Sequence, residues 1–163
     1  MMKIGRLISD MILYYSGDVK RINHFLKVYS FAKAIGENEV IDNAKQEILE
    51  VAAIVHDIGI KVSEQKYNSS AGKYQQIEGP KVAQEMLKIL DYNEVIIERV
   101  CFLIAHHHVY TNIDDVDYQI LVEADFLVNI EEEHLPLESI QKIKKQIFKT
   151  KTGNMYVQHL YLD

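Results

Sequence analysis

Apolar side chains recur at helical spacing along nearly the whole chain. Positions three and four residues apart are apolar in the first segment, namely Ile4, Leu7, Ile8, Met11, Ile12 and Tyr15. This spacing gathers side chains on one face of an α-helix, whereas a half-buried strand alternates every second residue. Gly17 and Asp18 follow, and these residue types commonly end one helix and cap the next. The pattern therefore predicts a helix near the start of the chain and a second one from about Lys20.

The same periodicity continues in later segments. It predicts helices over residues 20–36, 42–54, 79–90, 94–107, 118–130 and 137–148. Gly36 stops the apolar pattern of the first of these segments, Gly59 lies just past the end of the second, where glycine commonly follows a helix, and Pro80 suits a first helical turn. No pair of strands and no internal repeat is visible. We therefore expect an all-α fold of six or seven helices, as a single domain over residues 1–163.

Two segments lack a clear periodicity. Residues 61–76 are polar and rich in Ser, Tyr, Lys and Gln, which predicts a loop with at most one short helical turn. A loop longer than about 12–15 residues is usually functional or disordered, so we expect Tyr67, Lys73 and Tyr74 to form a lid over a substrate. The tail over residues 152–163 alternates weakly between apolar and polar positions, and we expect it to be extended.

The composition is that of an ordinary globular protein. Of the 163 residues, 48% are hydrophobic and 26% charged, and the few Gly and Pro residues exclude a collagen-like or Pro/Gly-rich disordered chain. The single cysteine, Cys101, excludes an internal disulfide and a cysteine-based zinc finger. No apolar run approaches the ~18–20 residues of a membrane span, and the N-terminal segment lacks the features of a secretory signal. We therefore expect a cytoplasmic protein without a membrane partner.

The formal net charge of -6 narrows the class of partner. Nucleic-acid-binding proteins commonly carry a basic excess or stripe, and none is visible here. Five lysines gather near the C-terminal end, which we interpret as a solvated helix face: Lys142, Lys144, Lys145, Lys149 and Lys151. We therefore expect no nucleic-acid partner. A small phosphorylated substrate is compatible with this charge, because a bound metal can supply positive charge locally.

Histidine and aspartate side chains stand inside apolar helical segments or at their ends. His24 is flanked by apolar residues, His56 and Asp57 close the segment over residues 42–54, and Asp125 stands in the middle of another. An ionised carboxylate buried without a partner is costly, and a metal ion is one partner that removes the cost. Neighbouring helical residues point about 100° apart, so a metal beside the helix end could take both His56 and Asp57. Imidazole and carboxylate ligands without thiolate suit Mn, Fe, Co, Ni, Zn or Mg.

These residues resemble the H…HD…D signature of the HD superfamily of metal-dependent phosphohydrolases. Three stretches carry the resemblance: RINHFLKV at residues 21–28, AAIVHDIG at 52–59 and LVEAD at 121–125. The resemblance covers about residues 20–130 and leaves a C-terminal helix and tail over residues 131–163. It implies a helical bundle with a divalent metal at its centre, held by four side chains: His24, His56, Asp57 and Asp125.

The resemblance also extends to a second metal. In two-metal branches of the superfamily, a histidine begins the helix after the core motif, and a His-His pair follows on the next helix. Glu78 stands here in place of the first histidine, and carboxylates can ligate hard metals. Aligning Ile104 with the family's isoleucine places His107 and His108 at the positions of the His-His pair, and His106 is then not a ligand. A shift of the alignment by one residue would bring His106 into the pair. The two interpretations are a dinuclear site, and a mononuclear site with Glu78 and the histidines lining the pocket.

The resemblance implies hydrolysis of a phosphoester or phosphoanhydride by a metal-activated water, on a nucleotide or another small phosphorylated molecule. Asp57 is the expected bridge between two metals, because a carboxylate has two oxygens. Arg21 and Lys61 are expected to act in catalysis and to bind the substrate phosphate, and Tyr74 to contact the substrate. Arg21 could instead pair with a carboxylate, and Lys61 could be a solvated lysine.

Two alternative functions stay open at this point. Some members of the same superfamily hold two irons and use O₂, which makes a di-iron oxygenase one alternative. A metal-binding module without turnover is the other, because a fold and a ligand set do not identify a reaction. The sequence leaves the substrate, the physiological metal and the oligomeric state open.

Overall fold

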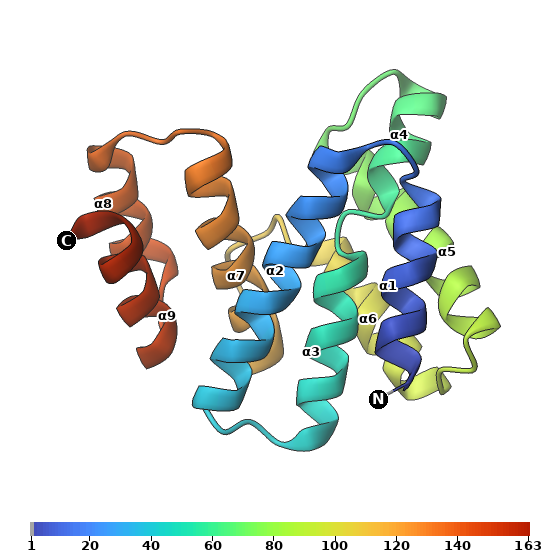
Figure 1. Cartoon of the computed structure of the whole chain (residues 1–163), viewed down its shortest axis with the longest axis horizontal. Coiled ribbons are helices and arrows are strands. Elements are labelled where there is room, and N and C mark those ends of the chain that lie inside the picture. Colours follow the sequence, from blue (N-terminus) through green and yellow to red (C-terminus); the bar gives the residue numbers. More distant parts are fainter. Residues whose placement is uncertain (1) are drawn as a thin grey trace.

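The computed structural model describes residues 2–163, which form helices joined by short connections (Figure 1). The helices are, in chain order, α1 (Met2–Tyr14), α2 (Val19–Asn38), α3 (Asn43–Val55), α4 (Gly59–Tyr67), α5 (Gly72–Ile89), α6 (Glu94–His106), α7 (Val116–Glu132), α8 (Leu137–Ile147) and α9 (Lys151–Val157), followed by a π-helical turn (Gln158–Leu162). No strand occurs among the described residues. None of these helices combines the length and apolar character that crossing a bilayer requires. The all-α fold expected from the apolar spacing is therefore confirmed.

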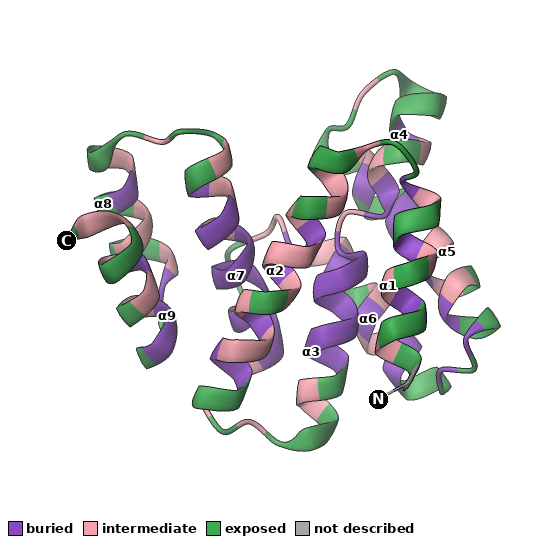
Figure 2. Ribbon diagram, in the orientation of Figure 1, coloured by how far each residue is buried: buried purple, intermediate pink, exposed green. Residues whose placement is uncertain are grey.

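Helix α3 forms the centre of the fold. Its residues 48–55 are all buried, and Figure 2 shows most of this helix as buried. Helices α1, α2, α6 and α7 pack against it. Helix α5 pairs with α6 and α4, whereas α8 and α9 lie beside α7 at the C-terminal edge of the molecule (Figure 1). The buried helix therefore ends in the interior, and the turn that follows it carries His56 and Asp57.

Short polar side chains set the starts of several helices. The carboxylate of Asp18 accepts a hydrogen bond from a backbone N–H of the first turn of α2, and Asp42 does the same for α3. Asn93, Asp115 and Thr150 cap α6, α7 and α9 in the same way. Such caps satisfy backbone donors that a first helical turn leaves unpaired. They therefore fix where the helices that carry the conspicuous histidines and aspartates begin.

The expectation of a loop over residues 61–76 is wrong. Helix α4 occupies Gly59–Tyr67, and only residues 68–71 connect it to α5. The residues that α4 buries are small, Gly59 and Ser63, rather than large and apolar. Apolar spacing therefore gave no sign of this helix. The lid expected from the length of the loop loses its basis, because the segment is mostly helical.

The tail over residues 152–163 is helical rather than extended, which is a second correction. Glu123 on α7 is completely buried and accepts hydrogen bonds from the backbone N–H groups of Lys149 (3.0 Å) and Thr150 (3.1 Å). The Thr150 hydroxyl also donates to it (2.6 Å) and caps α9. This polar contact holds the C-terminal helices against α7. It could not be predicted from the spacing of apolar residues, because the groups that form it are polar. With α4 and α9, the helices of the described residues exceed the expected six or seven.

Candidate metal centre

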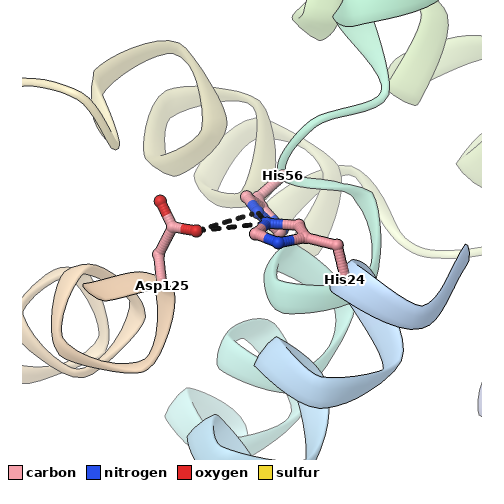
Figure 3. Close-up of side chains that lie close together, drawn as sticks. All are labelled: His24, His56 and Asp125. Carbon is pink, nitrogen blue, oxygen red and sulfur yellow. Dashed lines mark hydrogen bonds and ion pairs between the residues drawn. The ribbon is translucent and has the colours of Figure 1, made fainter. Parts of the chain in front are cut away.

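Four side chains from three parts of the chain converge inside the bundle. His24 comes from α2, His56 and Asp57 from the turn after α3, and Asp125 from α7. Figure 3 shows the two imidazole rings and Asp125 pointing toward one another. The two Nε2 atoms are 3.1 Å apart, and each lies 3.3–3.4 Å from an oxygen of Asp57 and of Asp125. The structure therefore brings together the side chains predicted to hold a first metal.

Each of the two imidazoles is oriented by a hydrogen bond at its other nitrogen. Nδ1 of His56 donates to the carbonyl of Ala53 (2.7 Å), and Nδ1 of His24 lies 2.5 Å from Oε1 of Glu132. Because these oxygens accept, Nδ1 carries a proton, and Nε2 is the nitrogen that can offer its lone pair to a cation once it has lost its own proton. Partners of this kind fix ring orientation and basicity in metal sites. Sequence reasoning missed Glu132, whose one signal was its place about two helical turns after Asp125.

A third histidine reaches the cluster from the turn after α6. Nε2 of His107 lies 3.3 Å from Oδ1 of Asp57, and its Nδ1 donates to a backbone carbonyl of α6 (2.6 Å). His107, His108 and Asp125 each offer a ligand atom, and these atoms lie within 4.8 Å of one another. His106 instead turns its Nδ1 to another carbonyl of α6. The structure therefore places the predicted His-His pair, and not His106, next to the other ligand candidates.

Glu78, predicted as a further ligand, is held by other partners. Its buried carboxylate accepts hydrogen bonds from the Tyr67 hydroxyl (2.9 Å) and from Nζ of Lys66 (3.2 Å). It belongs to none of the groups of candidate ligands found among residues 2–163. In this arrangement Glu78 joins α4 to α5 through an ion pair, and its role as a ligand stays a prediction.

The charges of the cluster shift one another's pKa values. Burial lowers the pKa of His24, but the nearby carboxylates of Asp125 and Asp57 outweigh it and raise the pKa to about 9. Burial also disfavours the charged forms of Asp57 and Asp125, yet the neighbouring imidazoles hold the pKa of both carboxyls below the ordinary range. Burial, together with the charge of His107, lowers the pKa of His108 to about 4. The carboxylates are therefore ionised and His108 neutral near pH 7, the forms in which they ligate metals.

Two buried polar atoms of the cluster have no hydrogen-bond partner among the described residues, namely Nε2 of His107 and Oδ1 of Asp125. Buried groups of this kind are rare unless water or an ion satisfies them. The facing lone pairs of His24 and His56 would also repel each other without a proton or a cation between them. A divalent cation removes both difficulties, and a donor set of nitrogen and oxygen without thiolate suits Mn, Fe, Co, Ni, Zn or Mg. The residues present therefore fit a metal ion.

Tyrosine hydroxyls hold the two turns that carry these side chains. Tyr15, buried just after α1, donates to the backbone carbonyl of Asp57 (2.6 Å). Tyr118 of α7 reaches the carbonyls of His106 (2.7 Å) and Val109, which flank the histidine pair. Carbonyls at helix ends lack partners within the helix, so an outside donor stabilises them. Sequence reasoning missed both tyrosines, because each looks like an ordinary member of an apolar stripe.

A cavity of about 360 Å³ lies beside the cluster and reaches His24 and Asp57. Its walls come from the end of α1, the first turns of α2 and the end of α7. Arg21, predicted to bind substrate, lines this cavity, but its guanidinium is paired with Asp18 (3.2 Å) and Glu64 (2.5 Å). Of the two roles that the sequence left open for Arg21, the structure displays the ion pair.

Lys61 and Tyr74, also predicted to bind substrate, lie outside this cavity. Nζ of Lys61 donates to the carbonyl of Tyr14 (2.9 Å) and lies over its ring, beside a smaller cavity. Tyr74 stacks on Tyr67 across the connection between α4 and α5, with ring centroids 4.1 Å apart. The structure therefore does not bring these two side chains to the ligand cluster, and their contact with a substrate stays a prediction.

Comparison with known proteins relates this geometry to one family. A family model for the HD domain matches residues 21–148. Among solved structures, the chain is similar to the crystal structure of a predicted HD superfamily hydrolase from an uncultured Thermotogales bacterium, with 20% sequence identity and a TM-score of 0.66. The match covers 99% of this chain and 84% of the other, and at this identity it shows the fold alone. No curated protein matches the chain.

Proposed function

This chain belongs to the HD domain family, and from that membership we propose that it is a metal-dependent phosphohydrolase acting on a small phosphorylated molecule. One observation carries the proposal. Imidazole and carboxylate groups from separate helices converge on one point, and two of their buried atoms have no hydrogen-bond partner among the described residues. The similar Thermotogales protein, described as a predicted hydrolase, supports the proposal.

We assign the first cation to four side chains: His24, His56, Asp57 and Asp125. When bound, a divalent cation polarises a phosphoryl oxygen and lowers the pKa of the water it binds. Asp57 is suited to bridge to a second cation, since its Oδ2 faces His24 and its Oδ1 faces His107. His107 and His108 would then hold the second cation, with Glu78 contributing only if it leaves its ion pair with Lys66.

The chain's own groups prepare the site for substrate. Among the four side chains assigned to the first cation, Asp57 is the most exposed at 21%, and it borders the cavity together with His24. Substrate would therefore approach from this side. His108, with a pKa of about 4, is a neutral imidazole at pH 7, the form that can bind a cation. Glu132 and Tyr15 hold His24 and the Asp57 turn in place.

Removal and return of metal tests this proposal. Protein stripped with a chelator should lose hydrolysis of phenyl phosphate and of a nucleotide panel, and should regain it with Mn, Fe, Co, Ni, Zn or Mg. The measurement is released phosphate together with the metal content of the same sample. Full activity in excess chelator, with no metal in the protein, would contradict the proposal.

The same samples test the two alternative functions. Imidazole and carboxylate ligands do not distinguish iron from manganese, so anaerobically purified protein is examined for iron and for O₂ consumption. Oxygen uptake without phosphate release would indicate a di-iron oxygenase. Stoichiometric metal with neither reaction would indicate a binding module.

A further inference from the structure

The cavity beside the cluster carries two polar side chains that the proposed mechanism does not use. Lys20 stands four residues before His24 on α2, and Asn129 stands four residues after Asp125 on α7. Residues four apart share a helix face, so each of the two residues lies about one turn, roughly 6 Å along the helix axis, beyond a predicted metal ligand. Helices α2 and α7 pack on each other, and both side chains line the same cavity.

Lys20 is the available cation of this cavity. Arg21 also lines it, but Asp18 and Glu64 already neutralise its guanidinium. Lys20 is exposed and forms no ion pair with any carboxylate of residues 2–163. Lysine binds phosphate groups as a compact charge on a flexible stem. Its position at the rim therefore suits the phosphate of a substrate whose reacting end sits at the cluster.

Asn129 is the uncommitted hydrogen-bonding group of the opposite wall. Its side-chain amide is half-buried and forms no hydrogen bond with the part of the chain that the structure describes. The neighbouring Glu132 is occupied by His24 and lies 3.5 Å from Lys27. An amide offers two N–H donors and one carbonyl acceptor. It therefore suits a substrate group that carries hydroxyls rather than an apolar one.

The size of the cavity limits the substrate. Its volume of about 360 Å³ is near the lower end of the range of roughly 300–1,000 Å³ found for small-molecule sites. Resting on the function proposed above, we infer that the substrate is a small phosphomonoester of a hydroxyl-bearing alcohol, with Lys20 binding its phosphate and Asn129 hydrogen-bonding to its alcohol.

Two substitutions and two substrates test this inference in metal-loaded, full-length protein. The substrates are ribose 5-phosphate, which carries hydroxyls, and phenyl phosphate, which has an apolar leaving group. Lys20→Ala should raise KM for both substrates, and the inhibition constant of inorganic phosphate, by about tenfold, the factor for one charged hydrogen bond. Lys142→Ala is the matched control, because Lys142 is an exposed lysine on α8 that does not line the cavity; it should change none of these values.

Asn129→Leu tests the second part of the inference, namely that Asn129 forms a hydrogen bond with the alcohol of the substrate. This variant should lower kcat/KM for ribose 5-phosphate about tenfold more than for phenyl phosphate, because only the first substrate loses a hydrogen bond. Equal losses on both substrates would overturn the role of Asn129, and a Lys20→Ala protein that behaves like Lys142→Ala would overturn the role of Lys20. If wild-type protein hydrolyses neither substrate but cleaves members of the nucleotide panel, the inferred substrate class fails and the proposed function stands. If it hydrolyses none of these compounds, the proposed function fails. Direct titration of inorganic phosphate into wild-type and Lys20→Ala protein then still decides whether Lys20 binds phosphate.

Discussion

The directions of the His24 and His56 rings are decided by a hydrogen bond on the far side of each ring. Ala53 and Glu132 accept from the Nδ1 atoms of His56 and His24, which leaves both Nε2 atoms turned to the same point. The carbonyl of Asp57 is held in turn by Tyr15. In metal sites, loss of such an outer partner typically costs about 10–100-fold in affinity or activity. These residues therefore support the proposed metal site although none of them is itself a proposed ligand.

Tyr15→Phe removes only the hydroxyl that holds the Asp57 turn. It leaves a carbonyl at a helix end without its donor, so we expect the metal-free protein to lose about 1–2 kcal/mol of its free energy of unfolding. The affinity for Mn or Co should fall by at least about tenfold, because the Asp57 carboxylate is less well positioned. Titration of metal and denaturant unfolding on the same protein measure both effects.

Tyr92→Phe provides the matched control for this substitution. The hydroxyl of Tyr92 is also buried but has no hydrogen-bond partner among residues 2–163. Removal of an unpaired buried hydroxyl should leave stability unchanged or higher, with metal affinity as in the wild type. Equal metal affinity in the two variants would contradict the positioning role of Tyr15.

At the scale of residues, ionisable side chains that interrupt an apolar segment can be recognised in the sequence as candidate site residues. Side chains that continue the apolar pattern cannot. His24, His56, Asp57 and Asp125 could be predicted because ionisable groups inside apolar segments are unusual. Tyr15 could not, because it continues an apolar stripe. The partners of Arg21 and Glu78 on α4 could not be predicted either, because they depend on where that helix packs.

At the scale of helices, the site depends on a close approach of two backbones. Helix α4 begins at Gly59, two residues after Asp57, and there it meets α5 at Gly79. A Cβ atom on Gly59 would lie 2.8 Å from the Cα and N atoms of Gly79, closer than real Cβ contacts. Since the obstacle is backbone, the helices would have to separate. Glycine at this position therefore sets how α4 leaves the turn that carries His56 and Asp57.

Gly59→Ala should force α4 and α5 apart. We expect a loss of about 1–3 kcal/mol in the free energy of unfolding, as for overpacked sites. Metal affinity should fall as well, because the displaced helix begins next to Asp57. Denaturant unfolding and metal titration measure the two effects.

Gly5→Ala is the comparison for this prediction. Gly5 lies in α1, and nothing stands within 4 Å of the Cβ atom that alanine would add. Alanine is a better helix residue than glycine by roughly 0.5–1 kcal/mol, so this variant should be more stable than the wild type. A Gly59→Ala protein that is equally stabilised and binds metal normally would contradict the close contact.

The errors in helix prediction have one physical origin. Helix α4 buries Gly59 and Ser63, and the C-terminal helices are tied to α7 through the carboxylate of Glu123 and Thr150. Small residues and polar contacts produce no apolar periodicity, so these segments read as a loop and a tail. The helices with wide apolar faces could be predicted, since burial of such faces stabilises them.

At the scale of the molecule, the site draws on more than the family motif. The HD match begins at residue 21, whereas Tyr15 precedes it and still contacts the turn of Asp57. The family resemblance of the three sequence motifs is confirmed by this match. The net charge of -6 agrees with a centre whose positive charge is brought by bound metal.

The most direct test of the account is the amount of divalent metal bound per chain in wild-type and Asp57→Asn protein, measured on samples whose folding is verified. Asparagine keeps the size of the side chain and one oxygen but removes the charge that faces His24 and His107. We predict that the wild type binds at least one metal ion per chain, and that the variant binds metal far more weakly and loses hydrolysis by orders of magnitude. A folded Asp57→Asn protein that is fully metallated and active would contradict the central claim.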